Sequence, residues 1–115
     1  MLNVYTAQYG YKGEGRIDIT VKSSTEPWNI FAPRWQMVNC YKKGNKDVIA
    51  EAIYTVQYED IIANAFATHG NELMDLIYSD HKIVLVCFCK AGDFCHRVLL
   101  AKHFEALGAI YHGEL

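Results

Sequence analysis

Four segments of the chain have the residue patterns of β-strands. Residues 2–8 predict a first strand, and residues 16–23 predict a second, because Ile17, Ile19 and Val21 alternate with polar residues. Residues 83–86 form an unbroken apolar run, which is typical of a strand buried on both faces. Residues 109–111 predict a short last strand.

Other segments have apolar residues at helical spacing. Residues 47–80 predict helix in two or more pieces, with Asp47 as the cap of the first piece and a break at Gly70. Another helix begins at Cys95 and ends near Gly108, where a capping glycine is common. Residues 24–45 show little periodicity and contain two prolines, so we expect a long connection without structure of its own.

This order of strands and helices predicts an α/β domain with a mainly parallel sheet of three or four strands flanked by helices. Ligands of open α/β sheets bind at the edge where the carboxyl ends of the strands lie. Several residues that belong to these strand ends or follow them are polar or carry sulfur: Thr6, Gln8, Lys22, Ser23, Cys87, Cys89 and Glu114. We therefore expect the functional site at this edge.

The junction between the third strand and the helix after it carries the strongest candidates. Cys95, His96 and Arg97 fall in the first turn of that helix, whose free N–H groups and dipole favour anions. The dipole and Arg97 would favour a thiolate at Cys95, which is the nucleophilic form of cysteine. His96 would then transfer protons, and Arg97 would bind a phosphate or carboxylate and serve the ligand, not the fold. The alternatives are a Cys95 that only packs, a His96 that only fixes the loop, and an Arg97 paired with Asp93 or Glu114.

The same block takes part in a resemblance to a known family. Residues 87–97 read Cys-Phe-Cys-Lys-Ala-Gly-Asp-Phe-Cys-His-Arg. Together with residues 4–6, 18–23, 31–35 and 113–114, this block resembles the uncharacterised family catalogued as domain of unknown function 488. The resemblance implies an α/β domain with its site at the Cys-His-Arg residues, and it leaves the reaction open.

Further residues near this edge are candidate ligand contacts. Asp18 and Lys22 share one face of the second strand, where they orient a substrate or form an ordinary ion pair. Thr6, Cys89 and Glu114 would lie beside them at the strand ends. The aromatic residues of the long connection either stack on a base or cover the core.

The cysteines leave two other chemistries open. Cys87, Cys89, Cys95 and His96 offer enough soft ligands for zinc, although structural zinc sites usually use Cys-x₂₋₄-Cys pairs on turns, so we assign no metal ligand. A disulfide between Cys89 and Cys95 is the one bridge with a plausible reach. Cys87 is expected in the core, because free cysteine is among the most buried residue types.

Composition narrows the classes of function. A length of 115 residues suits one domain over residues 1–115. A formal net charge of −2 and the lack of a basic cluster argue against duplex nucleic acid as a partner, but they still allow a small anionic ligand. We see no secretory signal and no apolar run near the ~20 residues of a membrane span, so we expect a cytoplasmic protein without a membrane partner.

These observations predict an anion-binding pocket that contains cysteine, at a strand-loop-helix junction. One hypothesis is a thiol-dependent enzyme that acts on a nucleotide or a nucleotide-derived ligand, with Cys95 as nucleophile and His96 as proton carrier. One alternative is a non-catalytic module that sequesters a small molecule or nucleotide with the same groups, and another is a structural zinc site. The residues identify no cofactor.

Overall fold

The computed structural model of the chain describes residues 1–90 and 92–115 and confirms the α/β prediction. In this part of the chain, four parallel strands form one sheet in the order β2-β3-β1-β4. The central strands are β1 (Asn3–Gln8) and β3 (Lys82–Cys87), and the edge strands are β2 (Arg16–Asp18) and β4 (Ile110–Glu114).

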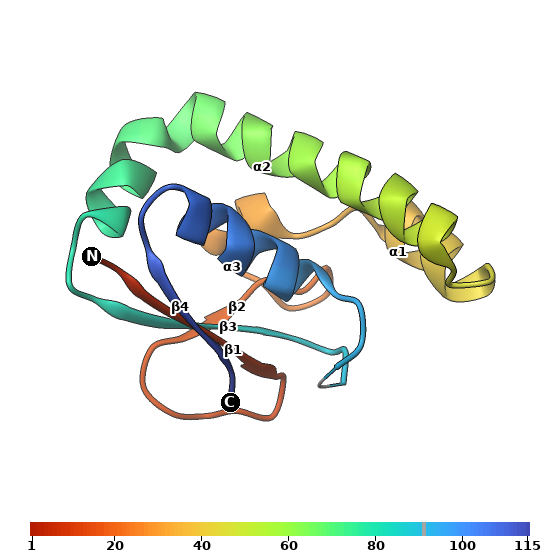
Figure 1. Cartoon of the computed structure of the whole chain (residues 1–115), viewed down its shortest axis with the longest axis horizontal. Coiled ribbons are helices and arrows are strands. Elements are labelled where there is room, and N and C mark those ends of the chain that lie inside the picture. The colour runs from red at the N-terminus through yellow and green to blue at the C-terminus, as the bar shows by residue number, and fades with distance from the viewer. Residues whose placement is uncertain (91) are drawn as a thin grey trace.

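The helices lie on one side of this sheet (Figure 1). They are α1 (Trp35–Lys43), the long α2 (Val48–Ile77) and α3 (His96–Ala106), and a short 3₁₀ helix, η1 (Trp28–Phe31), precedes them. None of the helices in the described residues combines the length and apolarity needed to cross a bilayer.

Strand β3 is buried on both faces, as its apolar run predicts. Side chains alternate between the two faces of a strand. Ile83 and Leu85 therefore join the main core under the helices, whereas Val84 and Val86 join a second, smaller cluster on the opposite face. Three partly buried tyrosines pack against that second cluster: Tyr5, Tyr9 and Tyr11. The loop after β1 thus helps to cover the face that the helices leave open.

Several predicted helix boundaries are confirmed. The Asp47 side chain caps α2 by accepting a hydrogen bond from the N–H of Ala50 at 2.9 Å. Within α2, His69 has non-helical angles (φ −127°, ψ 25°), so the helix is kinked one residue before the predicted break at Gly70. After α3, Gly108 has φ +116°, which glycine adopts at low cost.

The second strand is shorter than predicted, because β2 ends at Asp18 and not at residue 23. The carboxylate of Asp18 accepts hydrogen bonds from the backbone N–H of Thr20 at 2.8 Å and from its hydroxyl at 2.7 Å. This local pairing turns the chain away from the sheet. The last strand is longer than predicted and continues to Glu114.

Residues 24–45 are not an irregular connection, because they contain both η1 and α1. The two prolines that suggested irregular backbone, Pro27 and Pro33, lie one residue before η1 and two residues before α1, where no intrahelical N–H bond is lost. Met37 of α1 is buried. The helix therefore forms part of the layer over the sheet.

Candidate functional site

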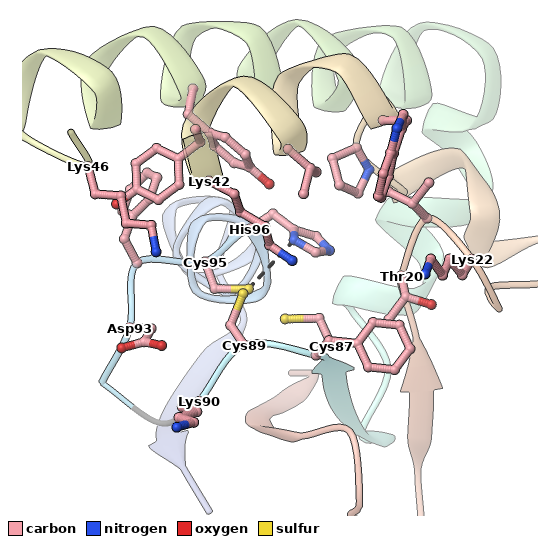
Figure 2. Close-up of a pocket in the computed structure, with 18 residues that line it drawn as sticks. Thr20, Lys22, Lys42, Lys46, Cys87, Cys89, Lys90, Asp93, Cys95 and His96 are labelled. Carbon is pink, nitrogen blue, oxygen red and sulfur yellow. Dashed lines mark hydrogen bonds between the residues drawn. The ribbon is translucent and has the colours of Figure 1, made fainter. Parts of the chain in front are cut away.

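A cavity of about 620 Å³ lies at the carboxyl end of β3. Its lining comes from the segment after β2, from α1, from α2 and from the loop between β3 and α3. In Figure 2, sulfur atoms gather at the centre of the view, with Lys46 on one side and Lys22 on the other. The cavity therefore lies at the sheet edge where the sequence predicts a functional site.

The sulfur atoms belong to Cys87, Cys89 and Cys95, and they all lie within 4.8 Å of one another. Cys87 ends β3, Cys89 follows two residues later, and Cys95 is the residue before the first turn of α3. Cys87 and Cys95 are buried, and Cys89 is half-buried. All are free thiols, so the disulfide considered between Cys89 and Cys95 is not formed.

His96 presents an unprotonated nitrogen to this cluster. Its Nε2 lies 2.8 Å from the carbonyl oxygen of Ile19. A carbonyl only accepts hydrogen bonds, so Nε2 must carry the proton. Burial lowers the pKa of His96, which keeps the ring neutral. Nδ1 then offers a lone pair 3.6 Å from Cys95 Sγ, where it competes with the neighbouring sulfur atoms for the single thiol proton of Cys95.

Arg97 is bound entirely by the protein. Its side chain is 1% exposed and makes a bidentate ion pair with Glu114, from Nη2 at 2.8 Å and from Nε at 3.2 Å. Nη1 donates to Cys87 Sγ and to the Cys89 carbonyl, both at 2.9 Å, and Nη2 donates to the Lys90 carbonyl at 3.3 Å. These contacts use all five N–H groups of a guanidinium. They correct the expectation that Arg97 serves the ligand and not the fold, and they show the pairing with Glu114 that was the alternative.

The three thiols differ in acidity. Hydrogen bonds from Cys89 and Cys95, and the nearby charge of Arg97, lower the pKa of Cys87. The same hydrogen bond to Cys87 raises the pKa of Cys89 to about 11. The pKa of Cys95 is also raised, by its hydrogen bonds to Cys87 and Cys89 and by burial. The shifts therefore favour a thiolate at Cys87 and a protonated thiol at Cys95, which is opposite to the lowered pKa that a helix start alone would give Cys95.

The rim of the cavity is basic and its walls are aromatic. Among the described lining residues, four are lysines and one is an acid: Lys22, Lys42, Lys46, Lys90 and Asp93. Trp35 and Tyr41 of α1 and Phe88 also line the cavity. The sequence alone did not single out Lys42 and Lys46, because it predicted no helix there. The available signal was Lys-Lys-Gly at residues 42–44, which is typical of a helix end.

The remaining predicted contacts divide into two groups. Lys22 lines the cavity, with its Nζ 5.8 Å from the centre of the Trp35 ring. Asp18 instead bonds to Thr20, and the buried hydroxyl of Thr6 lies 2.8 Å from the Tyr111 hydroxyl. Glu114 holds Arg97. The structure therefore gathers Lys22, Cys89, Cys95 and His96 around the cavity, whereas Thr6, Asp18, Arg97 and Glu114 bond to other parts of the protein.

A family model described as the active DUF488-N3 subclade matches residues 12–108. That span contains every residue that lines the cavity. No curated protein sequence and no solved structure matches the chain.

Proposed function

The chain belongs to the active DUF488-N3 subclade, and from this premise we propose that it is a cytoplasmic, thiol-dependent enzyme that acts on a nucleotide or a nucleotide-derived ligand. The observation that carries the proposal is the pairing of the Cys95 thiol with the unprotonated Nδ1 of His96 beside a cavity rimmed by lysines. A cytoplasmic location agrees with four free cysteines, because reducing compartments keep thiols unpaired.

The rim of the cavity supports an anionic ligand. The described lining residues include four lysines and one carboxylate, so the local charge is positive although the chain is acidic overall. The rings of Trp35 and Tyr41 offer flat apolar surfaces on which a base can stack. A volume of about 620 Å³ falls within the usual range for small-molecule pockets. Phosphate groups at the lysines and a base on the aromatic wall satisfy both features.

The proposed chemistry uses Cys95 as nucleophile and His96 as base. As the sulfur attacks the electrophilic centre of the ligand, the thiol proton passes to His96 Nδ1. A bond forms between Sγ and that centre, the bond to the leaving group breaks, and the leaving group takes the proton from His96. The Ile19 carbonyl holds the ring in the tautomer that this transfer requires.

Two observations favour a second candidate, a non-catalytic module that binds the same ligand. Cys95 is only 3% exposed, and its pKa is raised because its thiol is hydrogen-bonded to two other cysteines. Such a thiol is less reactive than an exposed one of ordinary pKa. The two candidates share the ligand and differ in whether Cys95 reacts.

The lysine rim can be tested with a matched pair of variants. Lys42 lines the cavity, whereas its neighbour Lys43 is exposed and outside the lining. A panel of nucleotides is titrated while the fluorescence of Trp35 is followed, with Trp28 as a constant background. We expect Lys42→Ala to weaken nucleotide binding roughly 3- to 10-fold, since one ion pair near the surface contributes on the order of 1 kcal/mol. Lys43→Ala should change nucleotide affinity little. Equal effects of the two variants would refute an anion site at this rim.

The thiol is tested by alkylation of reduced protein that has been treated with a chelator. Iodoacetamide at neutral pH should label Cys95 before the exposed Cys40, and peptide mass spectrometry reports both sites. His96→Gln should slow the labelling of Cys95 and leave that of Cys40 unchanged. A Cys95 that stays unlabelled until the protein unfolds would refute the nucleophile and support the binding module.

A further inference from the structure

The sulfur cluster also has the composition of a metal site. We propose that Cys87, Cys89, Cys95 and the Nδ1 atom of His96 bind one thiophilic divalent cation of the Zn²⁺ class. The inference goes beyond the proposed enzyme and does not depend on it. Because the metal would occupy Cys95, the metal-bound and thiol-reactive forms of the site would exclude one another.

The distances in the cluster are close to those of tetrahedral zinc. Zn–S bonds of about 2.3 Å place two sulfur atoms about 3.8 Å apart, and the three sulfur atoms here lie within 4.8 Å of one another. A Zn–N bond of about 2.05 Å places nitrogen and sulfur about 3.6 Å apart. Cys95 Sγ and His96 Nδ1 are separated by 3.6 Å. The three sulfur atoms would therefore have to approach one another by up to about 1 Å, whereas His96 Nδ1 already lies at the required distance from Cys95.

The surroundings of the four donors are also those of a metal site. A histidine that ligates a metal usually donates its other ring N–H to a carbonyl or carboxylate, and His96 Nε2 donates to the Ile19 carbonyl. Arg97 Nη1 donates to Cys87 Sγ at 2.9 Å, which stabilises negative charge on that sulfur. These groups orient the donors before any ion arrives. Binding would replace the thiol protons, so protons would be released as the ion enters.

The donor set selects the class of ion. Three thiolates and one imidazole are soft and borderline ligands, which zinc accepts in tetrahedral geometry. Calcium and magnesium prefer oxygen ligands, and Asp93 is the one carboxylate among the described residues that line the cavity. Structural zinc sites usually take two cysteines from a turn with Cys-x₂₋₄-Cys spacing, and the Cys-x-Cys spacing of Cys87 and Cys89 is shorter. Both sulfur atoms still lie in one cluster, because β3 ends at Cys87 and the chain bends before the start of α3.

The site can be tested with Co²⁺, which takes the place of Zn²⁺ and absorbs visible light. Reduced protein is stripped of metal and titrated with Co²⁺ without oxygen. We expect about one equivalent to bind, with a thiolate-to-cobalt charge-transfer band and the strong visible bands of a tetrahedral site, and Zn²⁺ should abolish both. Cys89→Ser should weaken binding at least 10-fold. The half-buried Cys89 is chosen because its replacement disturbs the core least.

Two controls decide the outcome. Cys40→Ser should bind Co²⁺ as the wild type does, because Cys40 is exposed on α1 outside the cluster. Zn²⁺ should raise the melting temperature of wild type and of Cys40→Ser, but not of Cys89→Ser. Absence of the charge-transfer band, or a band unaffected by Cys89→Ser, would overturn the metal site. Alkylation of Cys95 in chelator-treated protein is a separate measurement, so failure of the metal site can be told apart from failure of the enzyme.

Discussion

Replacing Arg97 with alanine should destabilise the fold by about 3 kcal/mol. Removing one partner of a buried ion pair costs about 3–5 kcal/mol, because it leaves the other charge without compensation. Arg97 is 1% exposed and holds Glu114, the Cys87 sulfur and two loop carbonyls. The Glu114 side chain is 25% exposed, so water can replace part of the lost pairing, and this places the loss at the lower end of the range.

The measurement is chemical unfolding of wild type and Arg97→Ala, followed by circular dichroism. A loss of about 3 kcal/mol is a large part of the roughly 5–15 kcal/mol that stabilises a typical domain, and it corresponds to a fall in melting temperature of roughly 10 °C. Arg97→Lys should lie between the two, because a lysine keeps the charge but has only three donors and no planar fork. Arg34→Ala, at an exposed arginine, is the matched control and should change stability little.

A double-mutant cycle with Glu114→Gln separates the ion pair from the other contacts of Arg97. Coupling between the two positions should be at least 1 kcal/mol, since they share two charge-assisted hydrogen bonds. A free energy of unfolding of Arg97→Ala within about 0.5 kcal/mol of the wild-type value would refute this prediction. The buried network would then contribute nothing to the fold, and Arg97 would again be a candidate ligand residue.

Three further substitutions test local features by the same unfolding measurement. Tyr58→Phe should cost about 1–3 kcal/mol, because the buried Tyr58 hydroxyl donates to the Phe31 carbonyl at 2.7 Å and the variant leaves that carbonyl unpaired. Asp47→Ala should cost about 1 kcal/mol through loss of the α2 cap. Gly15→Ala should cost more than about 1 kcal/mol, since φ is +80° and the new Cβ would lie 2.7 Å from a carbonyl of β3, whereas Gly10→Ala meets nothing and should be neutral. Equal free energies of unfolding for Gly15→Ala and Gly10→Ala would contradict the close approach of residue 15 to the β3 carbonyl.

The sequence predicted those elements that depend on a local pattern of residues. An unbroken apolar run reports burial on both faces, and β3 is buried on both faces. The Asp47 cap was predictable because it needs only its own carboxylate and the following turn. Helix α1 was not, because its nine residues have no side-chain cap at Arg34 and pack through contacts that the local sequence does not reveal.

The site was predictable in position but not in its division of roles. Cys87, Cys89 and Cys95 lie at one edge of the sheet because they belong to the carboxyl end of β3 and to the loop that follows it. Whether Arg97 faces a ligand or Glu114 depends on where β4 lies, and that is fixed by its pairing with β1. The lysines at residues 42 and 46 reach the cavity only because α1 packs beside it.

The position of β1 at the centre of a parallel sheet has a consequence for how the chain folds. Asn3 pairs with Lys82 on one side and with Ile110 on the other, so the partners of β1 follow 79 and 107 residues later in the chain. Contacts this distant in sequence slow folding, because a long loop must close before any strand pairing is gained. Until then both edges of an apolar strand are open to other chains, which favours aggregation of the incomplete protein. We therefore expect slow refolding, and a yield that falls as the concentration of the unfolded chain rises.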